Sequence, residues 1–191
     1  MIEQRRAFAQ QVAEKLSRVL ARLRFIDECG MHLGLTRLYG RAAPGERVVE
    51  ATPGYSGPHY TLVASLSLTG VQAPWAFEKA MNTQAFETYV EHILGPTLQA
   101  GDIVVVDNLS AHKGKPVQRL IEARGAQVVF LPPYSPDLNP IEKCWAKVKA
   151  ALRRAKARTW DVLLEALADA LRSVSAEDAL AWFKHCGYVS A

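Results

Sequence analysis

The sequence predicts an α/β fold in which helices cover both faces of a mixed sheet. Short apolar runs that end in polar residues, such as "GDIVVVDN" at 101–108, are typical of strands buried on both faces. Helical segments alternate with such runs in the second half of the chain, which favours parallel strands joined by crossovers. Apolar residues make up 49% of the 191 residues, enough for one sizeable core and too many for a disordered chain.

The first half of the chain predicts a helical lead-in and then a three-strand antiparallel meander. Apolar residues recur at every fourth position over residues 2–20, which indicates a helix, so residues 1–23 are assigned to the lead-in. Strands that follow one another closely in sequence favour antiparallel pairing. The strand signals are "LRFIDE" at 23–28, a strand, a Pro-Gly turn and a second strand over "LTRLYGRAAPGERVVEA" at 35–51, and "YTLVASLSLTG" at 60–70.

The second half of the chain predicts strands and helices in alternation. Asn82 is a candidate N-cap for a helix over 82–94, and Gly125 ends a helix that begins near residue 115. The remaining elements are strands at 102–107 and 126–134, a helix from Pro140 to about Arg158, and helices at 160–173 and 177–185. A mixed sheet of this kind with helices on both faces is the ribonuclease H-like arrangement, expected over residues 24–191. A doubly wound nucleotide-binding fold would need GxGxxG after its first strand, which "DECGMHLG" lacks.

The net charge, the cysteines and the lack of long apolar runs indicate which partners and which cellular location to expect. The net charge of +4 is a mild basic excess, compatible with a nucleic-acid partner. Cys29, Cys144 and Cys186 are odd in number and show no CxxC spacing, so reduced cytosolic thiols are favoured over disulfides or a zinc site. The sequence shows neither a signal peptide nor an apolar run long enough to cross a membrane, so a cytoplasmic location without membrane contact is expected.

Three acidic residues stand where predicted elements end or begin. Asp27 closes the first strand, Asp107 closes "IVVVD", and Glu142 opens the long helix. Ligand sites gather at strand ends in open mixed sheets, and crowded carboxylates raise one another's pKa values. Mg²⁺ prefers such oxygen ligands, and two ions roughly 4 Å apart can assist phosphoryl transfer. The three acids are therefore candidate metal ligands and catalytic residues.

Each candidate also has a simpler structural interpretation. Glu28 adjoins Asp27 but points to the opposite face of the strand, and it remains an alternative first ligand. Asn139 at the N-cap and Glu142 three residues into the helix have the spacing of a capping box, in which Glu142 would only stabilise the helix start. Asp107 could cap a turn or bind a ribose.

The long helix that Glu142 opens carries only basic charges after its first turn. No acid occurs between Glu142 and Asp161, although solvated helix faces normally mix charges. A helix of one sign that leads away from a metal site indicates a track for nucleic-acid phosphates. The candidate DNA-binding residues are Lys143, Lys147, Lys149, Arg153, Arg154 and Lys156.

Several blocks of the sequence together resemble one known family. In chain order these blocks are "FIDECG", "LYGRAAPGERV", "VVVDNLSAHKG", "LPPYSPDLNPIEKCWAKVK" and "WFKHCGY". They are similar to the blocks of the DDE superfamily endonuclease domain of bacterial insertion-sequence transposases, on the mariner-like branch. The resemblance runs from about Arg24 to the end, and the 34 residues between Asp107 and Glu142 match the spacing typical of that branch.

The resemblance implies a function for particular residues. The metal-binding acids of the family fall on Asp27, Asp107 and Glu142, and Asn108 and His112 fall in the block around the second acid as supporting residues. The implied cofactor is a pair of Mg²⁺ ions, with Mn²⁺ as an expected substitute. The implied activity is metal-dependent cleavage and strand transfer of a mobile DNA element. The implied partners are double-stranded DNA at the element ends and the target, with a homodimer in the active complex.

One departure from the family leaves rival interpretations open. Members usually carry a helix-turn-helix module before the catalytic domain, whereas only about twenty residues precede the first expected strand here. The chain is therefore expected to be the catalytic half, with that module absent or on a separate chain. The alternative function is a catalytically inactive remnant that binds DNA or a partner and regulates a full transposase. A repair or recombination nuclease is a weaker third interpretation.

Overall fold

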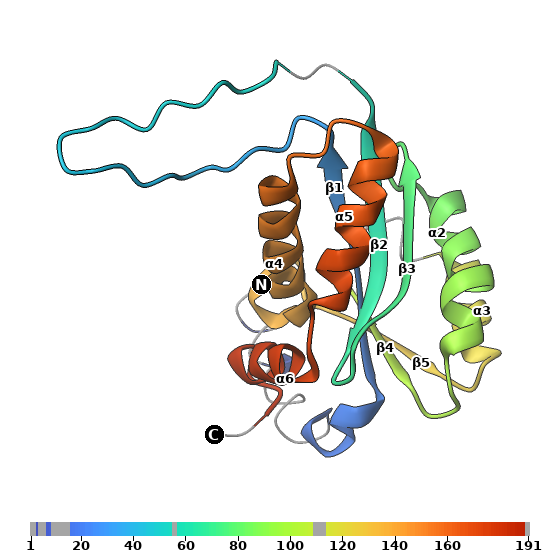
Figure 1. Cartoon of the computed structure of the whole chain (residues 1–191). Helices are drawn as coiled ribbons and strands as arrows, with labels where there is room; N and C mark the ends of the chain where they lie inside the picture. Colours follow the sequence, from blue (N-terminus) through green and yellow to red (C-terminus); the bar gives the residue numbers. More distant parts are fainter. Residues whose placement is uncertain (1–2, 4–6, 9–15, 55–56, 109–113, 190–191) are drawn as a thin grey trace.

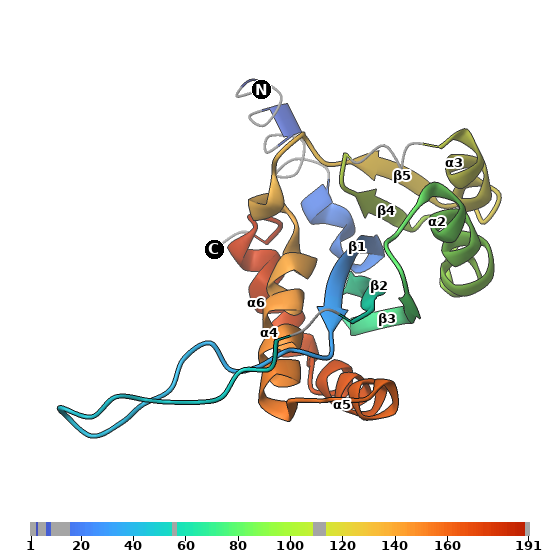
Figure 2. The same cartoon turned by 90° about the horizontal axis from the view of Figure 1, so that it is seen from above.

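One mixed sheet organises the part of the chain that the structure describes. The computed structural model describes residues 3, 7–8, 16–54, 57–108 and 114–189. Within these ranges five strands lie in the order β3-β2-β1-β4-β5. Helices α4, α5 and α6 cover one face of the sheet, and α2 and α3 cover the other (Figures 1 and 2). The predicted fold class is confirmed.

Strand pairing separates an antiparallel half of the sheet from a parallel half. β1 pairs antiparallel with β2 and β2 with β3, whereas β4 pairs parallel with β1 and β5 parallel with β4. The strands are β1 (Leu23–His32), β2 (His59–Ser67), β3 (Gly70–Glu78), β4 (Ile103–Val106) and β5 (Gln127–Phe130). The helices are α2 (Thr83–Tyr89), α3 (Lys115–Glu122), α4 (Pro140–Ala155), α5 (Trp160–Arg172) and α6 (Ala176–His185). None of the helices in the described ranges is both long and apolar enough to span a bilayer.

Successive side chains of the central strands point to opposite faces of the sheet, so an apolar core forms on each face. Phe25 of β1 packs in the core shared with α4, α5 and α6, whereas its neighbour Ile26 packs in the core shared with α2 and α3. The apolar stripe expected on the long helix is buried, as its spacing predicts. This stripe consists of Ile141, Trp145, Val148 and Leu152 of α4.

The strands predicted over residues 35–51 are wrong. The structure has no strand there; the chain leaves β1 in a long arm that projects from the body (Figure 1). Residues 37–54 are all exposed, so the apolar residues among them, such as Val48 and Val49, find no surface to cover. The third strand of the meander is instead β3, which the sequence interpretation missed because it contains Pro74. Proline is tolerated there because β3 lies at the sheet edge.

Helix boundaries also differ from expectation at two places. The long helix ends at Ala155, before the expected Arg158, because Lys156 adopts a left-handed conformation (φ 51°) and donates its N–H to the carbonyl of Leu152. Residues 16–22 form a 3₁₀ segment, and most of the predicted helix over 2–20 lies outside the described residues. The predicted Asn82 cap is confirmed, since its Oδ1 accepts from the Ala85 N–H at 2.8 Å.

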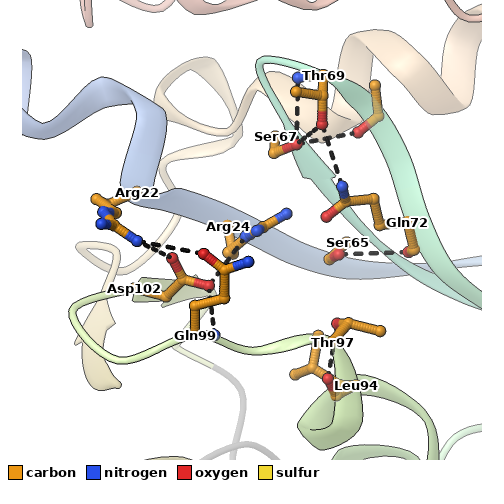
Figure 3. A network of polar contacts seen from close by, with 11 residues as sticks. Arg22, Arg24, Ser65, Ser67, Thr69, Gln72, Leu94, Thr97, Gln99 and Asp102 are labelled. Atoms are coloured by element: carbon orange, nitrogen blue, oxygen red, sulfur yellow. Dashed lines mark hydrogen bonds and ion pairs between the residues drawn. The ribbon is translucent and has the colours of Figure 1, made fainter. Parts of the chain in front are cut away.

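A buried ion pair joins the N-terminal ends of β1 and β4 (Figure 3). Asp102, whose side chain is 1% exposed, accepts from Arg24 Nε at 3.3 Å and from the Gln99 N–H at 3.0 Å. Arg22 approaches the same carboxylate at 3.9 Å but is half-exposed. Because Arg24 belongs to β1 and Asp102 directly precedes β4, the pair helps to hold the two strands in register.

We predict that Asp102→Ala destabilises the fold far more than Arg22→Ala. Removing the carboxylate leaves the largely buried Arg24 guanidinium without its ion-pair partner, which costs about 3–5 kcal/mol. Removing Arg22, which lies closer to water, costs less than about 1 kcal/mol. Urea denaturation of the two variants and the wild type measures both free energies of unfolding. A loss of less than about 1 kcal/mol for Asp102→Ala would show that the buried ion pair contributes little to the fold.

Candidate active site

The parallel register of β1 and β4 places Asp27 beside Asp107. The last pair in this ladder is Ile26 with Val106, and each acid is the next residue along its chain. The prediction that Asp27 closes its strand is wrong, because β1 continues to His32 through its pairing with β2, whereas Asp107 does follow the end of β4. Phe25 and Val105, two residues earlier, both pack in the core beneath α4. Side chains alternate between faces, so both carboxylates lie on the face that α4 covers.

A stiff turn after β5 brings α4 back to this edge of the sheet. The turn begins with the Leu131 N–H donating to the Val106 carbonyl at 2.8 Å, and Tyr134 takes a left-handed φ of 53° within it. Near its end the carbonyl of Leu138 accepts from the Tyr188 hydroxyl at 2.8 Å. The Tyr188 ring packs edge-on against Phe25 at 4.9 Å, so the C-terminal segment anchors the turn to β1.

One pocket of about 380 Å³ contains all three predicted acids. Asp27 enters it from β1, Asp107 from the end of β4, and Glu142 from the first turn of α4. Its lining consists of Asp27, Asp107, Asn108, Leu131, Pro132, Pro133, Tyr134, Ser135, Pro136, Asn139 and Glu142. Glu28, the alternative first ligand, does not line the pocket. Asn108 does, whereas His112 lies outside the described residues.

Asp27 sits in an environment that opposes its negative charge. Its side chain is buried, with the residue 7% exposed. Burial, followed by the negative charges of Glu142, Glu28 and Asp107, raises the pKa of Asp27 to about 8, although the Glu28 N–H donates to its Oδ1 at 2.9 Å. None of the described residues supplies a positive charge that lowers this pKa where the carboxylates gather.

Asn139 is a site residue that the sequence interpretation took for a helix cap. It stands at the N-cap position of α4, yet its side chain makes no capping hydrogen bond. Its Nδ2 instead donates to Oδ2 of Asp27 at 3.4 Å, and its buried Oδ1 has no hydrogen-bond partner in the described structure. The predicted capping box with Glu142 is therefore not formed. Only the long-range contact reveals this role, because the local pattern is that of an ordinary cap.

The donor set of the pocket fits a hard divalent cation. Carboxylate and amide oxygens are the ligands that Mg²⁺ prefers, and a cation there would offset the repulsion that raises the Asp27 pKa. Asn139 Oδ1, which lacks a partner in the described structure, adds a further neutral oxygen to the lining. As placed, no three His, Cys, Asp or Glu side chains of the described chain are grouped closely enough to enclose one ion. Mutual repulsion of like charges favours such separation.

Two of the six predicted DNA-binding side chains already have partners within the fold. Lys147 donates to Asp178 of α6 at 2.5 Å and to the Ser173 carbonyl at 2.8 Å. Lys156 pairs with Glu50 of the arm. The remaining four are half-buried or exposed along α4, and for all six a role in DNA binding stays a prediction. These four are Lys143, Lys149, Arg153 and Arg154.

Comparisons with known proteins agree with this geometry. Residues 22–163 match the model of a family described as the DDE superfamily endonuclease. The chain is also similar in structure to the Mos1 transposase paired-end complex with left transposon end (TM-score 0.77, 19% identity), covering 97% of this chain and 59% of that one. The Mos1 paired-end complex with Mg gives a TM-score of 0.72 at 18% identity, covering 97% and 59% of the two chains.

The similarity concentrates in one domain of those structures. The catalytic domain of Mos1 mariner transposase matches with a TM-score of 0.70 at 16% identity, and the match covers 97% of this chain and 89% of that one. The chain thus spans about 59% of the longer Mos1 chain. At these identities the likeness establishes the ribonuclease H-like fold. Comparison with curated protein sequences found no match.

We predict that Glu142→Gln leaves the apo protein stable but removes its response to cations. The side chain is exposed and forms no capping box, so the change should alter the free energy of unfolding by less than about 0.5 kcal/mol. If Glu142 is a ligand, Mg²⁺ or Mn²⁺ raises the melting temperature of the wild type and raises that of the variant much less. Thermal melts in EDTA and in each cation measure both effects.

Glu122→Gln is the matched control, because Glu122 is an exposed helical acid at the end of α3 outside the pocket. The control should keep the full response to cations. A large loss of stability of Glu142→Gln in EDTA would show a structural role instead. An undiminished response to cations in that variant would remove Glu142 from the metal site.

Proposed function

Because the chain belongs to the DDE superfamily of endonucleases, we propose that it is the catalytic domain of a transposase. It cuts DNA at the ends of a mobile element and transfers the freed strands to target DNA. The observation that carries the proposal is the meeting of Asp27, Asp107 and Glu142 in one pocket. The motifs of the sequence further favour the mariner-like branch of bacterial insertion sequences, and a DNA substrate there implies a cytoplasmic location.

The chemistry of the pocket is that of phosphoryl transfer assisted by cations. Two Mg²⁺ or Mn²⁺ ions held by Asp27, Asp107 and Glu142 would neutralise charge on the scissile phosphate and activate the attacking oxygen. Asp27 and Asp107 come from neighbouring strands of a rigid sheet, so their separation varies little. Glu142 comes from a separate helix whose start is held by the proline turn, so it closes the site from the other side.

Other lining residues support the three acids. The Asn139 amide holds one oxygen of Asp27 and leaves the other to the Glu28 N–H, which orients the carboxylate. Proline residues of the turn line the pocket with apolar surface and restrict the conformations of the chain there. Lys143 and Lys149, which follow Glu142 on α4, would bind phosphates of the DNA backbone beside the scissile bond.

The partners proposed for this chain follow from the reaction. Solved Mos1 structures include a paired-end complex with the left transposon end and a strand transfer complex, which supports duplex DNA as substrate and target. Joining two element ends requires two catalytic pockets, so we propose that the active complex contains two copies of the chain. Sequence-specific reading of the ends is assigned to a helix-turn-helix module on a separate chain or segment.

We predict that Asp107→Asn abolishes nicking of duplex DNA in Mg²⁺ or Mn²⁺ while the fold persists. The substitution removes a charge needed to hold cations, and it also removes a source of repulsion at Asp27, so apo stability should hold or rise. A supercoiled plasmid measures nicking, and urea denaturation in EDTA measures stability. Loss of activity should be at least about a hundredfold, comparable with removal of one essential charged group.

Asp137→Asn is the matched control for this experiment. Asp137 is an exposed acid of the same proline turn but does not line the pocket. The control should nick at the wild-type rate. Undiminished nicking by Asp107→Asn would remove Asp107 from the site. A wild-type chain that binds DNA but never nicks it in either cation would favour the inactive, regulatory interpretation.

A further inference from the structure

A second pocket lies between the start of the arm and the exposed side of α4. It has a volume of about 400 Å³, and three of its six lining residues are arginines. Arg37, Leu38 and Tyr39 come from the arm, and Ala150, Arg153 and Arg154 come from α4. We call these six residues the arginine groove. None of the described residues that line it is acidic.

The two arginines that α4 contributes to the groove are not used to hold the fold together. Within the described ranges, neither Arg153 nor Arg154 forms an ion pair or a side-chain hydrogen bond. This contrasts with Lys147 and Lys156 on the same helix, which pair with Asp178 and Glu50. The guanidinium groups of Arg153 and Arg154 therefore remain available to a ligand from outside.

The groove is formed where the arm is tied to α4. Glu50 on the returning leg of the arm pairs with Lys156 at the end of the helix. The same carboxylate lies within electrostatic reach of Arg37 and Arg158, and Arg158 donates to the carbonyls of Leu33 and Leu35 at 2.8 and 3.1 Å. These contacts hold the arm base against α4, although its outer part projects away from the body (Figure 2).

We propose that the arginine groove binds the backbone phosphates of duplex DNA whose scissile bond lies in the catalytic pocket. This inference rests on the proposed function and adds a second contact to it. Guanidinium groups match phosphate oxygens bidentately, and an exposed tyrosine supplies a hydroxyl donor of the kind that often contacts phosphates. Tyr39 is 89% exposed at the groove. A second copy of this chain is a poorer ligand, because its net charge is also positive.

The helix sets the distance between the two sites. Arg153 lies 11 residues after Glu142, which is about three turns and places both on nearly the same side of α4. The rise between them is about 16 Å at 1.5 Å per residue. DNA advances about 3.4 Å per base pair, so a duplex that reaches both sites must extend about 5 base pairs from the scissile bond. Lys149 lies between them on the same side of the helix.

A pair of double variants of the full chain tests the proposal by DNA binding. Arg37→Ala with Arg153→Ala removes two cations from the groove, and Arg41→Ala with Arg47→Ala removes two from the exposed arm outside it. Fluorescence anisotropy measures the affinity for a labelled duplex of about 30 base pairs over a range of salt concentrations. The groove variant should lower the slope of log affinity against log salt by about two, and the arm variant should leave it nearly unchanged.

A nicking assay then tests the distance. Duplexes that end about 3 base pairs beyond the nick should be cut equally by the wild type and the groove variant. Those that extend about 10 base pairs should be cut more slowly by the groove variant at limiting DNA, because only they reach the groove. A defect of the groove variant that is the same at both lengths would contradict the proposed span.

Several results would overturn the proposal. If the two double variants gave equal slopes of log affinity against log salt, DNA binding would depend only on the overall charge of the chain and not on the groove. Inorganic phosphate or polyglutamate that binds the wild type and not the groove variant, with the DNA slope unchanged, would identify a free-anion or acidic-protein site. The slope of log affinity against log salt is measured without DNA cleavage. It therefore tests DNA binding by the arginine groove separately from the proposed transposase activity. A wild type that never nicks would defeat the proposed function while a lowered slope still supported the groove.

Discussion

The parallel pairing of β1 with β4 in one register is the constraint on which the site depends. The ladder ends at Ile26 and Val106, so the residues that follow, Asp27 and Asp107, share one edge and one face of the sheet. A shift by one residue would turn one carboxylate to the opposite face. The buried pair of Arg24 and Asp102 ties the same two strands at their other end, which gives that register support from outside the pocket.

Crowding of negative charge at this edge has a structural cost, which a metal-binding role would explain. Asp27 is buried among like charges and its pKa is raised to about 8, so the apo fold gains nothing from a carboxylate there. The proline turn nevertheless lines this pocket, and the Asn139 amide donates a hydrogen bond to Asp27 within it. The Tyr188 hydroxyl holds the turn in place through its hydrogen bond to the Leu138 carbonyl. The cations of α4 begin directly beyond it. The negative pocket suits the binding of divalent cations, and the positive helix suits the binding of a phosphate backbone. Together they suit a cation-dependent reaction on DNA.

Much of this fold could be predicted from the sequence because its signals are local. Continuous apolar runs marked β1, β4 and β5, and helical periodicity marked α4. The candidate acids Asp27 and Asp107 followed from these runs, although Asp27 lies within β1 and not at its end. The arm was misjudged because two strand-like runs around a Pro-Gly turn at 35–51 suggest paired strands unless the lack of a covering surface is known. β3 was missed because Pro74 hides an edge strand. Asn139 was misjudged because its partner, Asp27, lies 112 residues away. The ion pairs of Lys147 and Lys156 likewise depend on distant elements.

The central claim is that Asp27, Asp107 and Glu142 together hold divalent cations. Anomalous diffraction from crystals of the wild-type chain soaked in Mn²⁺ tests it directly, because manganese scatters anomalously and carboxylates bind it as they bind Mg²⁺. If the three acids bind the metal, we expect anomalous peaks in the pocket, within about 2.0–2.4 Å of oxygens from these three side chains. Peaks that lie only on other carboxylates, such as Glu28, or no peak in the pocket at saturating Mn²⁺, would contradict it.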